Sequence, residues 1–226
     1  MPNKKRAIIA GSTGETGKRL LGNLIADNLV AEIHLLVRSP TDLTNPKVQQ
    51  HIVDFNNLDA TPIPHSDLLE NISYCTLGTT IKKAGSRDKF AQVDLEFVIN
   101  FAHWSLKNEC KEFAVISSLG ADKTSNNFYL KTKGQMEYEL SSLPWKSLWI
   151  FRPSLLIGQR SEFRFAEKLG AIAAKLISPL FLGPLKKYAP IEMDDVAKSL
   201  SDLIYEEQNG INIIESNDIA RMASER

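Results

Sequence analysis

Three glycines at intervals of three residues mark the first expected turn from a strand to a helix. The apolar run 7–10 ends at Gly11, and Gly11-Ser12-Thr13-Gly14-Glu15-Thr16-Gly17 leads into residues 17–28, where apolar side chains recur at helical spacing. Glycines at such a turn let the backbone bend tightly and approach a pyrophosphate, and the helix N-terminus supplies amide donors. An isolated glycine triplet is about equally often a plain tight turn. The position at the first strand-to-helix turn favours a dinucleotide-binding loop formed by all seven residues. A nucleoside-triphosphate loop does not fit, because Arg19 follows Lys18 where that loop needs Ser or Thr.

The rest of the chain alternates short apolar runs with amphipathic stretches. We expect helices over 94–107, 127–143 and 194–206, and strands over 33–37, 52–53, 72–76, 113–116, 148–151 and 211–214. Strands that alternate with helices predict right-handed crossovers and a parallel sheet covered on both faces. The expected fold class is therefore α/β, a doubly wound parallel sheet of the Rossmann type.

The same pattern predicts how the chain is divided. No internal repeat or Gly/Ser-rich linker interrupts it, so we expect a single domain over 1–226. Residues 1–160 would form the cofactor fold and hold the catalytic pair. Residues 161–226, which include the apolar stretch 163–186, would cover the substrate.

The composition excludes several other classes of protein. The chain has 226 residues with 27 Lys and Arg against 27 Asp and Glu, and this balance gives no general attraction to nucleic acid or anionic lipid. Its two cysteines, Cys75 and Cys110, are too few for a disulfide framework, and four scattered histidines offer no metal-ligand spacing. We therefore expect no metal, no nucleic-acid partner and no membrane partner. The start of the chain has only four apolar residues before Gly11, far short of a signal-peptide core, so a cytoplasmic location is expected.

The ends of the next three strands supply further candidate cofactor contacts. In many dinucleotide-binding folds an acidic residue about 20 positions after the glycine loop binds the ribose 2′-hydroxyl, but Arg38 and Ser39 stand there in this chain. A guanidinium suits a 2′-phosphate, so the sequence predicts NADP(H) in preference to NAD(H). Asp54 is placed to accept from the adenine amino group, or else it only caps a turn. The segment Leu77-Gly78-Thr79-Thr80 allows the backbone to approach the nicotinamide side of the cofactor.

Tyr129 and Lys133 form a candidate catalytic pair at the start of the helix expected over 127–143. Residues four apart share a helix face, with about 5–6 Å between their Cβ atoms. A tyrosine can protonate the alkoxide formed by hydride transfer when a nearby ammonium lowers the phenol pKa from its ordinary value of about 10. Lys133 would supply that charge. Ser118, at the end of the fifth strand, would orient the substrate oxygen, with Ser117 as the competing candidate. Tyr-x-x-x-Lys alone is a weak signal, and it is the order of glycine loop, serine pair and Tyr-x-x-x-Lys that favours catalysis.

The chain resembles the atypical short-chain dehydrogenase/reductases, close to the Tat-interacting-protein oxidoreductase-like branch and more distantly similar to NmrA-like proteins. The stretches that carry the resemblance span nearly the first 160 residues and are 11–17, 37–38, 75–80, 83–85, 93–94, 117–123, 129–134 and 151–153. The resemblance implies a Rossmann fold that binds NADPH through the glycine loop and Arg38, with Tyr129 and Lys133 as the catalytic pair. Some members of this family bind dinucleotide but act as regulators or redox sensors.

Two functions follow from these expectations. The first is an NADPH-dependent oxidoreductase that transfers a hydride to a small carbonyl or related substrate, with Tyr129 as proton donor assisted by Lys133 and Ser118. The alternative is a non-catalytic NADP(H)-sensing regulator whose apolar segment 176–185 binds a protein partner. The expected assembly is a monomer or a homodimer.

Overall fold

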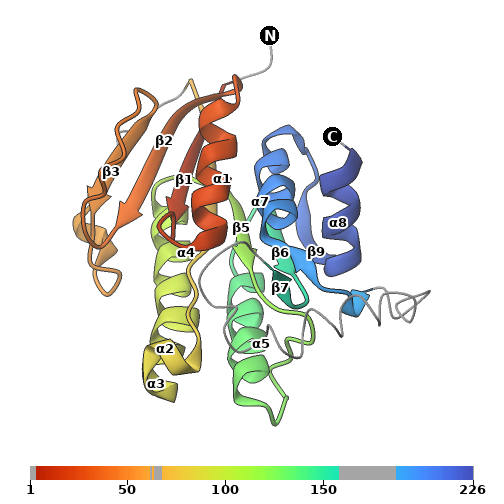
Figure 1. Ribbon diagram of the computed structural model, residues 1–226. Helices are drawn as coiled ribbons and strands as arrows, with labels where there is room; N and C mark the ends of the chain where they lie inside the picture. Colours follow the sequence, from red (N-terminus) through yellow and green to blue (C-terminus); the bar gives the residue numbers. More distant parts are fainter. Residues whose placement is uncertain (1–3, 62, 64–67, 158–186, 226) are drawn as a thin grey trace.

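The computed structural model describes residues 4–61, 63, 68–157 and 187–225. Its centre is a seven-stranded parallel sheet in the order β3-β2-β1-β4-β5-β6-β9 (Figure 1). The strands are β1 (Lys5–Ala10), β2 (Val30–Val37), β3 (Val48–Ile52), β4 (Glu70–Cys75), β5 (Glu112–Ile116), β6 (Ser147–Arg152) and β9 (Gly210–Glu215). From β1 the chain moves outward to β3, and from β4 it moves outward in the opposite direction to β9. This is the doubly wound Rossmann pattern, so the predicted fold class is confirmed.

Helices cover both faces of the sheet and enclose two hydrophobic cores (Figure 1). Alternate side chains of a strand point to opposite faces, so Ala7 and Ile9 of β1 join one core while Ile8 and Ala10 join the other. The first core packs against α1 (Glu15–Ala26), α7 (Met193–Ser201) and α8 (Ser216–Glu225). The second packs against α4 (Phe97–Lys107) and α5 (Phe128–Ser141). Within the described residues, no helix is long and apolar enough to span a bilayer.

Several elements differ from the sequence-based expectation. The third strand runs over Val48–Ile52 instead of 52–53, because this edge strand has three polar residues, Gln49, Gln50 and His51, in its centre and so has no apolar run. The helix expected over 94–107 begins at Phe97, after the π-helical turn η2 (Gln92–Glu96). The helix expected over 194–206 ends at Ser201 and continues as the 3-10 turn η5 (Asp202–Tyr205). Elements with no predicted counterpart include η1 (Leu58–Ala60), α2 (Ile81–Ala84), α3 (Arg87–Ala91), α8 and the parallel pair β7 (Leu156–Ile157) and β8 (Ile191–Glu192).

The expected substrate cover lies only partly within the described residues. The apolar stretch 163–186 lies outside them, and so does the segment 176–185 considered as a docking surface. The described part of the cover contributes β9, which pairs with β6 along its whole length, and α7, which packs on α1. Residues 187–225 therefore complete the main sheet and its helical layer.

Candidate functional site

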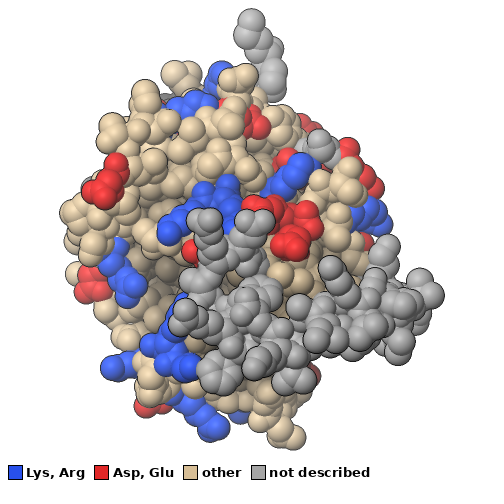
Figure 2. All heavy atoms as spheres, viewed as in Figure 1, with Lys and Arg blue, Asp and Glu red and all other residues tan. Residues whose placement is uncertain are grey.

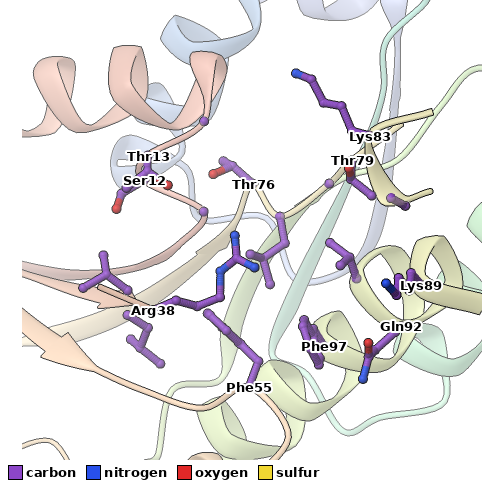
Figure 3. Close-up of a pocket in the computed structure, with 18 of the residues that line it drawn as sticks. Ser12, Thr13, Arg38, Phe55, Thr76, Thr79, Lys83, Lys89, Gln92 and Phe97 are labelled. Atoms are coloured by element: carbon purple, nitrogen blue, oxygen red, sulfur yellow. The ribbon is translucent and has the colours of Figure 1, made fainter. Parts of the chain in front are cut away.

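A cavity of about 590 Å³ lies where the strand order reverses, the place at which doubly wound sheets bind ligands. Ala10 pairs with Leu36 of β2 and with Cys75 of β4, so the chain leaves all three strands side by side. The predicted cofactor residues that line the cavity are Gly11, Ser12, Thr13, Gly14, Arg38, Asp54, Leu77, Gly78 and Thr79 (Figure 3). Those that do not line it are Glu15, Thr16, Gly17, Ser39 and Thr80.

Close backbone packing explains the glycines of the loop. Gly11 has a φ of 93°, and a Cβ there would lie 2.6 Å from the carbonyl carbon of Thr76. A Cβ on Gly17 would lie 2.2 Å from the carbonyl oxygen of Gly11, although Gly17 does not line the cavity. Gly17 therefore serves the packing of α1 against the loop, while Gly11 and Gly14 border the cavity itself.

Two features of the glycine loop fit an anionic group. The Ser12 Oγ is buried and has no hydrogen-bond partner in the described part of the chain. At the N-terminus of α1, the N-cap residue Gly14 provides no side-chain hydrogen bond to the first amides. Buried hydroxyls and helix-terminal amides normally find partners, and the positive end of the helix dipole favours a phosphate as that partner.

Arg38 and Asp54 form the wall beside the ends of β2 and β3. Figure 3 shows the Arg38 side chain extending into the cavity, and no hydrogen bond or ion pair joins it to another described residue. Asp54 accepts hydrogen bonds from the backbone N–H and the side-chain amide of Asn56, at 2.9 and 2.8 Å. These bonds hold the pKa of Asp54 below its usual range. The turn-capping contact that the sequence left open is therefore present, in a residue that also lines the cavity.

Other lining residues were not in the predicted set. Lys83 and Lys89, from the short helices α2 and α3, add cations to the wall, and Phe55, Asn56, Gln92, Val93 and Phe97 add apolar and amide surface. Lys83 lies in the stretch 83–85 that carries the family resemblance, and this resemblance could have indicated that Lys83 lies at the site. Lys89 had none, because a lysine between short polar segments is typical of any surface.

Lys133 is buried, does not line the cavity, and forms an ion pair. Its Nζ lies 2.8 Å from Oδ1 of Asp94 and 3.4 Å from the carbonyl oxygen of Ile116. Burial by itself opposes the ammonium, but the attraction of Asp94 and Tyr129 and the hydrogen bond to Asp94 outweigh it. The pKa of Lys133 is therefore raised, and the side chain keeps its charge beside Tyr129.

Asp94 connects this ion pair to the cavity wall. It lies in η2, is buried, and its Oδ2 accepts the backbone N–H of Thr79 at 2.8 Å. The sequence placed Asp94 at the start of a helix without assigning its function. Its contacts to Lys133 and Thr79 join three segments far apart in sequence, so no local pattern could have indicated them.

The two candidate serines have different surroundings. Ser117 is buried and its Oγ donates to Oε1 of Glu137, which also accepts from Nε of Arg152 at 3.0 Å. Ser118 is half-buried, and among the residues that the structure describes its Oγ makes only a long contact of 3.4 Å, to the carbonyl oxygen of Leu119. Ser117 is thus held in a buried polar network, which favours Ser118 as the residue that binds substrate. The assignment stays a prediction.

Gly134 lets the loop after β5 cross α5 next to the predicted catalytic pair. A Cβ at this position would lie 2.2 Å from the carbonyl carbon of Asp122 and 2.2 Å from the backbone nitrogen of Lys123. The N–H of Asp122 donates to the carbonyl oxygen of Leu130 at 3.1 Å. The loop that begins with Ser118 is therefore fixed against the first turns of α5.

The fold and the position of the cavity define the class: a doubly wound Rossmann fold of the NAD(P)-binding type. Across the described residues, no group of three or more His, Cys, Asp or Glu side chains is placed to hold a metal ion. No protein-family model matches the chain.

Relatives identify the family. Protein HTATIP2 from Rattus norvegicus is 32% identical over 224 residues, which are 98% of this chain and 90% of that protein. Mitochondrial protein FMP52 from Candida glabrata is 30% identical over 161 residues, 71% of this chain and 67% of that protein. The chain belongs to the HTATIP2/FMP52 family of atypical short-chain dehydrogenase/reductases, so the resemblance seen in the sequence is confirmed.

Solved structures agree on the fold. The human epimerase family protein SDR39U1 (isoform 2), solved with NADPH, matches with a TM-score of 0.61 and 17% identity, over 96% of this chain and 78% of its own. A putative NAD-dependent epimerase/dehydratase from Bacillus halodurans matches with a TM-score of 0.66 and 19% identity, over 98% and 100%. At these identities the match concerns the fold alone.

The expected cytoplasmic location is wrong by comparison with these relatives. The FMP52 proteins of Candida glabrata, Candida albicans and Coccidioides immitis are named as mitochondrial. The expectation rested on the lack of a secretory signal-peptide core. That argument addresses secretion and does not address import into an organelle, which uses a different kind of segment.

Proposed function

We propose that the protein is an NADPH-dependent oxidoreductase that transfers a hydride to a small carbonyl or related substrate. The observation that carries the proposal is the buried, charged Lys133 beside Tyr129, connected through Asp94 to Thr79 in the cavity wall. Lysine is almost never buried unless it is paired, and here a second buried charged residue, Asp94, is present to pair with it. Support of a proton-donating tyrosine is a function that such a pair can serve.

The polar groups of the cavity wall support the choice of NADPH as the cofactor. We assign Arg38 to the 2′-phosphate, and the Ser12 Oγ with the amides at the start of α1 to the pyrophosphate. SDR39U1, which shares the fold, was solved with NADPH, and this supports the choice of a nicotinamide dinucleotide. The preference for the 2′-phosphorylated form rests on Arg38.

The chain's own residues supply the proton. Bound NADPH supplies the hydride that adds to the carbonyl carbon. Tyr129 donates its phenol proton to the carbonyl oxygen as negative charge develops there, and the product is an alcohol. Lys133 stabilises the phenolate that remains, and its burial strengthens this effect because charges interact more strongly away from water. Ser118 donates a hydrogen bond to the same oxygen and orients it.

The test begins with binding and proceeds to turnover. Purified protein is titrated with NADPH and NADH by fluorescence, and the tighter complex is screened against a panel of carbonyl compounds. Tyr129→Phe should lower kcat at least about tenfold while the Kd for NADPH changes less than about twofold. Tyr138→Phe is the matched control, because Tyr138 lies on the same helix and is exposed. Undiminished turnover in Tyr129→Phe, or failure to bind either dinucleotide, would overturn the proposal.

The regulatory alternative has a distinct outcome in the same experiment. Tight binding of NADPH with no turnover of any compound in the panel would favour a sensor. The segment 176–185 that motivated this alternative lies outside the described residues. We give the enzyme the first place because Lys133 is buried and charged beside Tyr129.

A further inference from the structure

The segment between β4 and α4 lines part of the cavity and also contacts the predicted catalytic pair. Residues 79–96 comprise α2, α3 and η2 with their connections. Lys83, Ala84, Lys89, Gln92 and Val93 of this segment line the cavity, and Figure 3 shows Lys83, Lys89 and Gln92 on one side of it, opposite Arg38. The same segment contacts several side chains of α5, and two of these points of contact are Tyr129 and Lys133, the predicted catalytic pair.

The first point is Phe90, which is fully buried. Its ring lies 5.6 Å from the ring of Tyr129, centre to centre, at an interplanar angle of 45°. It also lies 5.9 Å from the ring of Phe128. Tilted aromatic pairs at such distances are mutually stabilising. The residue before Phe90 is Lys89, so α3 borders the cavity with one residue and holds Tyr129 with the next.

The second point is Asp94, and each of its two carboxylate oxygens has its own partner. Oδ1 pairs with Nζ of Lys133 at 2.8 Å, and Oδ2 accepts the N–H of Thr79 at 2.8 Å. Thr79 is the first residue of the segment and lines the cavity, so this bond closes the segment into a loop near its two ends. The π-helical turn η2, a rare geometry that recurs at functional sites, holds Asp94 in this place.

We propose that Phe90 and Asp94 are positioning residues, through which residues 79–96 hold Tyr129 and Lys133 for proton transfer. The proposal rests on the proposed function. Without Phe90 the Tyr129 ring loses a packing partner, and without the Asp94 carboxylate the buried ammonium of Lys133 is left unpaired. Each loss moves a reacting group without removing it. Proton transfer is sensitive to displacements of this kind.

The kinetic test separates position from stability. Phe90→Leu and Asp94→Asn should each lower kcat at least about tenfold and change the Kd for NADPH less than about threefold. Two control variants make the same kinds of substitution, loss of a buried carboxylate and trimming of a buried ring, away from the predicted catalytic pair. Glu112→Gln removes a buried carboxylate paired with Lys146 at 2.6 Å, at the start of β5, and Phe101→Leu trims a fully buried ring of α4. The controls should lower the melting temperature and leave kcat within about twofold.

A spectroscopic test follows Tyr129 without cofactor. Protein labelled with 3-fluorotyrosine gives one fluorine resonance for each tyrosine, and Tyr129→Phe identifies the resonance of Tyr129. Phe90→Leu and Asp94→Asn should shift or broaden that resonance, and Glu112→Gln should leave it in place. This measurement stands even if Tyr129→Phe retains turnover and the proposed function fails.

One substitution carries a risk of unfolding. Asp94→Asn leaves a buried lysine without a counter-charge, which is costly, so Asp94→Glu is made beside it. Asp94→Glu keeps the charge and displaces the carboxylate by one methylene, and it should lower kcat in a folded protein. Wild-type kcat in Phe90→Leu and in the folded Asp94 variants, with an unchanged Tyr129 resonance, would overturn the proposal.

Discussion

Gly134→Ala should destabilise the protein, although alanine is the better helix former. Gly134 lies in the interior of α5, where replacing glycine with alanine ordinarily stabilises by about 1 kcal/mol. At this position the added methyl would meet backbone: its carbon would lie 2.2 Å from atoms of Asp122 and Lys123. Backbone cannot rotate away as the end of a flexible side chain can. Either the loop after β5 moves or α5 does.

The size of the effect follows from the displacement. Ordinary van der Waals contact begins at 3.4 Å, so in a close-packed interior the loop must retreat by about 1.2 Å. Overpacking of this kind costs about 1–3 kcal/mol, and loss of the bond from the Asp122 N–H to the Leu130 carbonyl adds about 1 kcal/mol. The higher helix propensity of alanine offsets part of this cost, so the free energy of unfolding falls by about 2 kcal/mol in total. For a chain of this length it lowers the melting temperature by about 4–8 °C.

The assay compares two glycines in two helices. Gly22 lies in α1, and a Cβ there would meet nothing within 4 Å. Gly22→Ala should therefore raise the free energy of unfolding by about 0.5–1 kcal/mol, while Gly134→Ala lowers it, both measured by chemical denaturation and calorimetry. Gly134→Ala should also lower kcat, because the displaced loop begins at Ser118. If both substitutions stabilise equally, the close approach of loop and helix is refuted.

Three further predictions concern charge, the serine pair and pH. Arg38→Gln should weaken NADPH binding at least about tenfold and leave NADH binding within about twofold; equal losses for the two would contradict a 2′-phosphate contact. Ser118→Ala should lower kcat about tenfold or more, whereas Ser117→Ala should chiefly lower the melting temperature, since its hydroxyl serves a buried glutamate; the opposite pattern would exchange their functions. Burial lowers the pKa of His34 and the pKa of His51 below the ordinary histidine value of 6.5. Below that pH the histidines of the unfolded chain therefore take up protons more readily than those of the folded protein. Stability should therefore be full above that pH and fall as pH drops below it, and melting temperatures that do not change between about pH 7.5 and pH 5 would contradict this.

The sequence predicted the parts of the fold whose pattern is local. β1 and β6 are buried strands that each contain a run of four apolar residues, and their positions are close to those expected. β3 was misplaced because it is an edge strand, half exposed, with glutamines and a histidine in its centre. The short helices α2 and α3 have too few residues to show a period of 3.6.

The same distinction applies to the site. Gly11 to Gly17 and the pair Tyr129 and Lys133 are local spacings, and the fold brings the glycine loop and the pair to the carboxyl edge of one sheet. Asp94 and Phe90 act across distances of more than 30 residues in sequence. Their partners are set by the packing of η2 and α3 against α5, which a single sequence does not encode in any short pattern.

The polar groups of the two halves of the site differ in a way that bears on mechanism. On the catalytic side, the ammonium of Lys133 and both oxygens of Asp94 are already paired. On the dinucleotide side, the buried Ser12 Oγ and the solvent-exposed guanidinium of Arg38 have no hydrogen-bonding or ion-pair partner within the described residues, and of the two only Ser12 is a buried group. Buried polar groups are rarely left unpaired unless a ligand completes them, whereas reacting groups work best when fixed beforehand. Under the proposed function, an anionic ligand supplies the partner that Ser12 lacks, and the predicted catalytic pair is organised before that ligand arrives.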